Sequence, residues 1–240
     1  MKLLIVLPAY NEQELLERSV DRVIAYCRQA LVDEWQIIIS DNHSTDATAE
    51  IGKRLAAKYP QVEYLYVATR GKGAAIRAAW QQPADVYCFM DADLATELSA
   101  LPAALEKIRA GFDLAVGSRM LVESHVERSM LRRVISTGYR LVLQLSLGLY
   151  VTDAPCGFKA ITREAWQRLE RQIENNGWFF DSELLALAEV NGLRIAEVPV
   201  TWKDPREGND HSRVRVVSLS LNYLRQVLRL RRRLKRRAYV

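Results

Sequence analysis

The sequence predicts an α/β fold with a mostly parallel central sheet and helices on both faces. Short apolar segments alternate with amphipathic ones through the first half of the chain, and this pattern is typical of strands joined by crossover helices. The length of 240 residues fits one large domain or two small ones. We see no internal repeat and no low-complexity linker that would mark a boundary between domains.

Each expected element follows from its own residue pattern. Five apolar runs have the length and composition of buried strands: 2–7, 36–40, 62–67, 86–90 and 114–117. Helical spacing between them predicts helices over 16–31, 51–56, 71–82 and 99–109. The second half is less regular, with expected helices over 127–149, 163–172 and 181–191, strands over 158–161 and 193–202, and a long helix from about residue 216.

The composition excludes several classes of protein. Apolar residues make up 49% of the chain and charged residues 26%, which excludes wholesale disorder. The three cysteines include no C-x-x-C pair, so a disulfide scaffold and a cysteine zinc site are disfavoured and a reducing cytosol fits best. No apolar run reaches the roughly 20 residues that span a bilayer, and the N-terminus lacks a signal-peptide cleavage pattern. We therefore expect neither export nor a membrane span.

The basic charge is concentrated at the C-terminus. Residues 225–237 contain eight Lys or Arg and no acidic residue, and without them the net charge changes from +5 to −3. Such a segment favours contact with a polyanion. We expect two parts, a catalytic domain over 1–215 and a basic amphipathic helix over 216–240.

Polar residues follow the five expected strands of the first half. Because parallel strands end at one edge of a sheet, these residues should converge where α/β proteins bind ligands. The five segments are Pro8-Ala9-Tyr10-Asn11-Glu12, Asp41 to Asp46, Arg70-Gly71-Lys72-Gly73, Asp91-Ala92-Asp93 and Gly117-Ser118-Arg119. Ser44 and Asp46 are better explained as helix caps, and Gly71-Lys72-Gly73 matches neither a phosphate loop nor a dinucleotide fingerprint.

The pair Asp91 and Asp93 is the sharpest chemical signal. Two carboxylates that leave an apolar strand repel each other and lose solvation unless a cation lies between them. Mg²⁺ or Mn²⁺ takes carboxylate oxygens and shares its remaining positions with substrate phosphates. The alternative is that the pair only caps the following turn. Basic residues at neighbouring strand ends favour a metal–diphosphate site.

In this order and spacing, the strand-end motifs resemble glycosyltransferase family 2. Three later motifs are similar to its polyprenyl-phosphate branch, the dolichyl-phosphate β-glucosyltransferases and mannose synthases: Asp153-x-x-Cys156-Gly157-Phe158-Lys159, Trp178-x-Phe180-Asp181-x-Glu183-Leu184 and Glu197-Val198-Pro199-Val200-x-Trp202. The resemblance extends from about residue 3 to 215. It implies a GT-A fold, a Rossmann-like architecture that binds nucleotide sugars.

The resemblance also implies roles for individual residues. Residues matching the nucleotide-sugar site are Pro8, Ala9, Tyr10, Glu12, Asp41, Lys72 and Asp91. Asp91 and Asp93 match the carboxylates that hold the metal, and catalytic roles are expected for them together with Arg119 and Asp181. Residues expected at the acceptor phosphate are Arg119, Arg132, Ser136, Lys159 and Arg213. For Asp181 the alternative is the N-cap of the 181–191 helix.

The implied activity is an inverting, metal-dependent hexosyl transfer to a polyprenyl or dolichyl phosphate. Ala95-Thr96 after Asp91-x-Asp93 differs from the mannose synthases and favours UDP-glucose over GDP-mannose as the donor. A polyprenyl phosphate is largely dianionic at neutral pH, because its second pKa is near 6, and it needs no general base. The alternatives are a family 2 enzyme with a hydroxyl acceptor, such as a polysaccharide or glycolipid, and a nucleotidyltransferase.

A lipid acceptor requires the enzyme to work at a membrane. The segment 216–237 combines an apolar stripe with clustered positive charge, as do helices that lie on anionic bilayers. We therefore expect a cytoplasmic protein, peripheral on the cytoplasmic face of the membrane, with a membrane-anchoring partner protein as a further candidate. A frayed helix end is the plainer alternative. Nucleic-acid binding is least favoured, because no nucleic-acid motif accompanies the charge.

Overall fold

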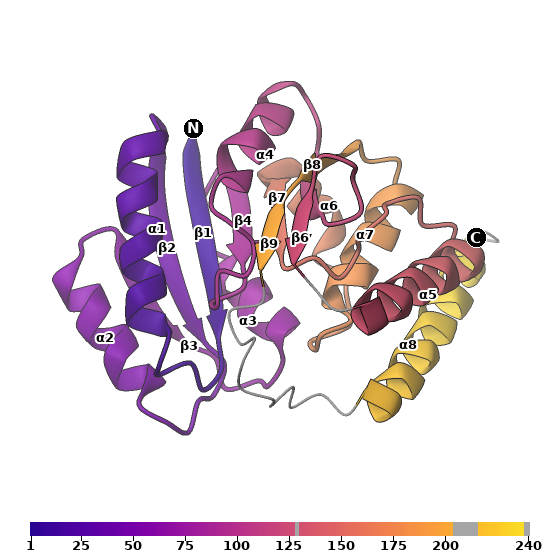
Figure 1. The fold of residues 1–240 in the computed structure, drawn as a ribbon, viewed down its shortest axis with the longest axis horizontal. Helices are drawn as coiled ribbons and strands as arrows, with labels where there is room; N and C mark the ends of the chain where they lie inside the picture. Colours follow the sequence, from indigo (N-terminus) through magenta and orange to yellow (C-terminus); the bar gives the residue numbers. More distant parts are fainter. Residues whose placement is uncertain (128–129, 204–215, 238–240) are drawn as a thin grey trace.

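A seven-stranded sheet forms the centre of the molecule in the computed structural model (Figure 1), which describes residues 1–127, 130–203 and 216–237. The spatial order is β3 (Val62–Tyr66), β2 (Glu34–Asp41), β1 (Lys2–Ala9), β4 (Val86–Met90), β7 (Phe158–Thr162), β5 (Leu114–Ser118) and β8 (Ile195–Pro199). Neighbouring strands are parallel, except that β7 is antiparallel to β4 and β5. The mostly parallel sheet is as predicted.

Helices cover both faces of the sheet, also as predicted. One face packs against α1 (Leu16–Ala30), α2 (Thr48–Lys58) and α4 (Ala100–Arg109). The other packs against α3 (Lys72–Ala79), α5 (Met130–Leu147), α6 (Arg163–Leu169), α7 (Phe180–Val190) and α8 (Val216–Arg237). Strand β1 serves both cores, because alternate side chains of a strand point to opposite faces: Leu3 and Ile5 pack on one side, Leu4 and Val6 on the other.

The expected strand over 193–202 is wrong in one respect, because it divides after Pro199. Its second part, β9 (Thr201–Lys203), leaves the central sheet and pairs in parallel with β6 (His125–Glu127). Strand β6 was not predicted. A three-residue strand is too short to show a period-two pattern, so its existence depends on its partner in the tertiary structure.

Helix α8 packs on the main body of the protein and lies beside α5 (Figure 1). Val227 and Leu230 are buried in the same core as residues of α5 and α7. Leu224 and Leu228 are 43% and 48% exposed, although each directly follows a residue that packs against this core, Tyr223 or Val227. The helix thus has a packed face beside an apolar exposed one. Among the described residues, no helix is both long and apolar enough to cross a membrane.

Candidate active site

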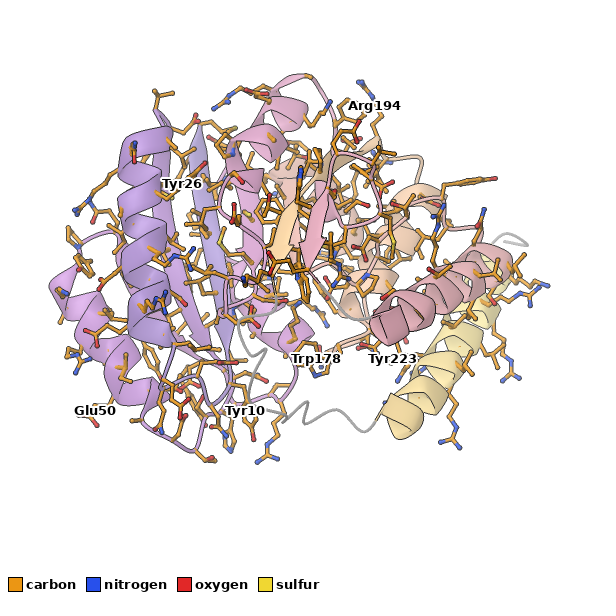
Figure 2. All side chains as sticks on the ribbon, in the orientation of Figure 1. Tyr10, Tyr26, Glu50, Trp178, Arg194 and Tyr223 are labelled. Carbon is orange, nitrogen blue, oxygen red and sulfur yellow. The ribbon has the colours of Figure 1, made fainter. Side chains whose placement is uncertain are left out.

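The carboxyl ends of β1, β2, β4 and β5 lie along one edge of the sheet, the lower edge in Figure 1. Because β7 is antiparallel to its neighbours, its amino end reaches this edge and brings residues 153–157 with it. Tyr10 and Trp178 lie at the same edge, whereas Arg194 lies at the opposite one (Figure 2). The strand-end residues of the sequence therefore share one edge with two later motifs.

The loops after β1 and β2 are fixed to each other by hydrogen bonds. The Asn11 N–H donates to Ser44 Oγ at 3.0 Å, and the Thr45 N–H donates to Asn11 Oδ1 at 2.8 Å. The N-cap role expected for Asp46 is wrong, because Ala47 occupies the N-cap position of α2. Asp46 Oδ1 accepts the N–H of Thr48, the first residue of the helix, at 2.9 Å. Ser44 instead joins the two loops. The ring of Tyr10, 48% exposed, is thereby presented to the solvent from a rigid support.

Asp41 is fully buried at the end of β2. Its Oδ2 accepts the Tyr64 hydroxyl at 2.6 Å, and its Oδ1 accepts the Ser44 N–H at 3.0 Å. Burial and this bond to Asp41 raise the pKa of Tyr64, which therefore remains a donor. Asp41 supports the loop that follows β2, so a contact with a nucleoside would have to share oxygens that already accept protein donors.

Four charged side chains form a continuous chain at the centre of the edge. Lys72 Nζ lies 2.7 Å from Asp91 Oδ1 and 3.2 Å from Asp181 Oδ2. Lys159 Nζ lies 2.6 Å from Asp181 Oδ1. The capping alternative for Asp181 is wrong, because α7 begins at Phe180 and Phe179 occupies the N-cap position. Asp181 is instead held between two lysines that come from different parts of the chain.

Both lysines are buried beside carboxylates. Burial acts against the charge of Lys72, but Asp181 and Asp91 raise its pKa overall. Lys159 is fully buried and also donates to the carbonyls of Ala154 and Cys156, at 2.9 and 2.7 Å. An ammonium group has three donors, and all three of Lys159 are engaged within the protein. The predicted contact of Lys159 with an acceptor phosphate would require one of these bonds to be exchanged.

The carboxylate of Asp91 is 38% exposed and is positioned by the loop that precedes β7. The backbone N–H of Asp91 donates to the Gly157 carbonyl at 3.0 Å, and a side chain at position 157 would overlap the Asp91 carboxylate. Asp93 Oδ1 accepts the Ala95 N–H at 3.1 Å. Only glycine at position 157 leaves room for the carboxylate of Asp91. Two carboxylates, Asp91 and Asp93, with substrate phosphates as the remaining ligands, are a set that suits a divalent cation. No cluster of three His, Cys, Asp or Glu suited to a metal occurs among the described residues.

Arg119 leaves the end of β5 and pairs with Asp153. Its Nε and a terminal nitrogen donate to the two carboxylate oxygens at 2.7 and 2.8 Å, and its own N–H adds a third bond at 2.9 Å. Burial opposes the charge of both groups, yet the pair raises the pKa of Arg119 and lowers that of Asp153. The guanidinium also lies 5.3 Å from the centre of the Trp202 ring. Arg119 is thus held rigidly at the predicted edge.

Of the remaining residues predicted at the acceptor phosphate, Arg132 and Ser136 belong to α5, and Arg213 comes later in the sequence. Ser136 is on α5, one turn before Tyr139, whose hydroxyl is 2.8 Å from Ser182 Oγ next to Asp181. This bond places α5 against the beginning of α7. The side chain of Arg132, and all of Arg213 together with Ser212, lie outside the described residues. Their predicted contacts therefore stay predictions.

Two residues with clear positions in the site were not among the residues expected there. Trp178 is 62% exposed, and Lys72 Nζ lies 5.6 Å from the centre of its ring. Asp153 is the buried partner of Arg119. Both belong to motifs that the sequence contains, so their presence was visible. The partner of Asp153 depended on the antiparallel placement of β7. The partner of Trp178 depended on the packing of the loop before α7 on the beginning of α3, and no local pattern indicates either arrangement.

The mostly parallel sheet with helices on both faces, and the polar motifs at its edge, fit the GT-A-type transferase fold that the motifs imply. The family model of glycosyl transferase family 2 matches residues 4–169, and the chain belongs to this family. The glycosyltransferase AglD of Haloferax volcanii is 36% identical over 203 residues, which cover 83% of this chain and 32% of AglD.

The comparisons also support the branch. The dolichyl-phosphate beta-glucosyltransferase ALG5C of Trichomonas vaginalis is 32% identical over 212 residues, which cover 83% of this chain and 63% of that protein. The chain thus spans less than two thirds of either relative. In fold it is similar to glucosyl-3-phosphoglycerate synthase of Mycobacterium tuberculosis, solved with Mn²⁺, UDP and its product, with a TM-score of 0.66, 21% identity, and coverage of 95% and 78% of the two chains.

Proposed function

We propose that this protein transfers a hexose from a nucleotide sugar to a polyprenyl phosphate, with inversion at the anomeric carbon. UDP-glucose is the favoured donor, in keeping with relatives such as ALG5C, which is named as a dolichyl-phosphate beta-glucosyltransferase. An oxygen of the acceptor phosphate attacks the anomeric carbon from the side opposite the leaving group. The bond from that carbon to the donor diphosphate breaks, and the nucleoside diphosphate leaves with the electron pair.

The arrangement of Asp181 is the observation that carries this proposal. A hydroxyl acceptor needs a base that removes its proton, and the carboxylate of Asp181 would be the candidate for that role. Both of its oxygens are within 3.2 Å of lysine ammonium groups, so neither is placed to receive a proton from an acceptor. A phosphate acceptor is already ionised at neutral pH and requires a cation instead, which Arg119 supplies at this edge.

Asp91 and Asp93 would hold a divalent cation, Mg²⁺ or Mn²⁺, at the donor diphosphate. Bound there, the ion would neutralise charge that develops on the leaving group. Lys72, 2.7 Å from Asp91, orients that carboxylate and adds a fixed positive charge beside it. The solved neighbour that contains Mn²⁺ and UDP is consistent with this assignment, but at 21% identity it is similar in fold alone.

The exposed aromatic side chains at the edge fit the donor. Tyr10 presents its ring at the end of β1, where a nucleoside base can stack on it. Trp178 presents a larger ring next to Lys72, at a place suited to the sugar or to the diphosphate. Arg119 is assigned to the acceptor phosphate through the part of its guanidinium that Asp153 does not occupy.

The protein works on the cytoplasmic face of a membrane, to which α8 contributes contacts. Leu224 and Leu228 leave an apolar strip on this helix, and basic side chains beside it are exposed: Arg225, Arg229, Arg231, Arg232 and Lys235. Apolar and cationic groups side by side bind anionic bilayers. A membrane partner protein could add to this attachment.

Incubation with labelled UDP-glucose or GDP-mannose, a short polyprenyl phosphate and Mn²⁺ tests the proposal. The matched control acceptor is the corresponding polyprenyl alcohol, which lacks the phosphate. We expect label in the lipid fraction with the phosphate alone, and an acid-labile β-linked product. Transfer to the alcohol at the same rate would instead support a hydroxyl acceptor, and release of the sugar 1-phosphate would support a nucleotidyltransferase.

A further inference from the structure

Among the basic side chains of α8 that the structure describes, Arg233 stands apart because it is buried against the catalytic domain. Only 17% of its side chain is exposed, compared with 73% for Arg229 one turn earlier. A charge is costly to bury unless it is paired, and Arg233 has two partners. One terminal nitrogen lies 2.9 Å from Glu174 Oε2, and the other bonds to Glu183 Oε1.

Glu183 connects this arginine to the loop that precedes α7. It is 3% exposed, and its second oxygen accepts the N–H groups of Glu174 and Asn175 at 3.2 and 2.7 Å. The proposed reaction assigns no role to Glu183, although it belongs to the Trp178–Leu184 motif. Its carboxylate holds the loop with one oxygen and Arg233 with the other.

The same loop lies directly on the amino end of α3, which carries Lys72. The Ala74 N–H donates to the Asn176 carbonyl at 3.0 Å, and the Gly73 N–H donates to the Gly177 carbonyl at 3.3 Å. The backbones approach so closely that a side chain at Gly71, where φ is 126°, would overlap the Asn176 carbonyl. The position of this loop therefore limits where Lys72, and with it Asp91, can lie.

We propose that Arg233 is a positioning residue for the donor site, and that it makes nucleotide-sugar binding depend on the docking of α8. It acts through Glu183 and the loop over residues 174–178, which carries Trp178 and fixes the beginning of α3. This inference rests on the proposed function, because it assumes that Asp91 and Lys72 meet the donor diphosphate. It predicts that the basic helix does more than contact a membrane.

The test is a titration of UDP-glucose and GDP-mannose, each with Mn²⁺ and without acceptor, into the wild type and into Arg233→Met. Coupling through a packed network is worth about 0.5–2 kcal/mol, so the dissociation constant should rise by about two- to thirtyfold. The matched control is Arg109→Met, which removes an arginine from an ion pair with Asp33 outside the site. We expect this control to bind like the wild type.

Two further variants separate positioning from a loss of folding. Arg233→Lys keeps the charge but a single ammonium cannot pair with both glutamates in the same way, so its affinity should lie between those of the wild type and Arg233→Met. Glu174→Gln changes a side chain that is 50% exposed, so it should weaken the binding of the nucleotide sugar without unfolding the chain. In steady state, the donor KM should rise and the acceptor KM should not.

The results distinguish this inference from the proposed function. A wild type that binds neither nucleotide sugar would overturn both. If the wild type binds one nucleotide sugar and Arg233→Met binds it equally well, the role of Arg233 alone would be overturned. Should Arg233→Met fail to fold by circular dichroism, wild-type donor affinity in both Arg233→Lys and Glu174→Gln would overturn it.

Discussion

The two halves of this molecule place functional residues at the same edge by different means. In the first half, β1 to β4 and their helices follow one another by the local rules of a parallel sheet, and each strand brings its own residues to the edge. In the second half, the antiparallel β7, the small β6–β9 sheet and the paired α5 and α8 depend on partners far away in sequence.

This difference has a functional meaning. The first half forms most of the surface that we assign to the donor, with Tyr10, Asp91 and Asp93, and Trp178 of the second half adds to it. The second half contributes Asp153, Lys159 and Asp181, which orient Arg119 and Lys72 through buried ion pairs. A regular scaffold therefore presents the ligand-binding groups, and the irregular half fixes their geometry.

Of the changes that test this comparison of the two halves, the removal of Arg119 should have the largest effect on stability. Arg119→Ala leaves Asp153 buried, at 1% exposure, without its cation, and breaking a buried pair in this way costs about 3–5 kcal/mol of unfolding free energy. Urea denaturation measures this loss. The acceptor KM should also rise more than the donor KM.

A double variant gives the matched control for this experiment. Arg119→Leu combined with Asp153→Leu removes both charges, and it should be more stable than Arg119→Ala alone, because no uncompensated charge stays buried. Equal KM increases for both substrates would move Arg119 to the donor diphosphate. An unchanged acceptor KM would remove it from the site.

Asp93→Asn tests the donor half. It removes one hard anionic ligand from the predicted metal site, and the turnover number should fall by about 100- to 1000-fold, comparable to the loss of a group that stabilises charge in a transition state. Metal-dependent nucleotide-sugar binding should weaken while the unfolding curve stays unchanged. Asp21→Asn, on the surface of α1, is the control, and wild-type turnover in Asp93→Asn would contradict the metal assignment.

Replacing exposed arginines of α8 with neutral side chains tests the membrane contact and leaves the packed face of the helix unchanged. Each Lys or Arg near an anionic surface contributes about 1 kcal/mol, so Arg225→Gln with Arg231→Gln should weaken vesicle binding by about thirtyfold. Co-sedimentation with anionic and neutral vesicles measures the effect. Deletion of the whole segment is a poorer test, because Val227 and Leu230 belong to the core. Equal binding to both kinds of vesicle would leave the basic face without a lipid partner.

The pH profile should show the smallest effect. Lys72 has a raised pKa and stays cationic as the pH increases, whereas Asp153 has a lowered pKa and stays ionised as the pH decreases. The stability that the Asp153 pair contributes is present above the ordinary pKa of Asp and is lost only as the pH falls through the lowered value. These two groups therefore keep their charges between about pH 5 and 9.

Within that range the acceptor phosphate, with a second pKa near 6, is the group expected to titrate. The ratio kcat/KM for the acceptor should fall by about tenfold per unit below pH 6 and level off above pH 7. Stopped assays in constant ionic strength across this range measure it. A second, alkaline decrease before pH 9 would indicate a protein group that takes part as an acid.

The sequence alone predicted the sheet, the helices on both faces and the family. Apolar periodicity is a local property, so the strands at 86–90 and 62–66 could be placed closely, and the order of the polar motifs indicated the family. Asp91 and Asp93 were identifiable because two carboxylates after an apolar strand are unusual without a cation. The packing face of α8 was less predictable, since Leu224 and Leu228 carry the same apolar signal as Val227 and Leu230.

Tertiary structure decided which charges meet. Three ion pairs join residues that are far apart in sequence: Lys72 with Asp181, Arg119 with Asp153, and Arg233 with Glu183. Local patterns in a single sequence do not indicate contacts between such distant residues. The antiparallel β7 is the physical reason for the Arg119–Asp153 pair, because it turns the Asp153–Gly157 loop toward the edge where the parallel strands end. The same strand brings Lys159 to Asp181. Local pattern thus determined which groups the protein carries, and long-range packing determined their partners.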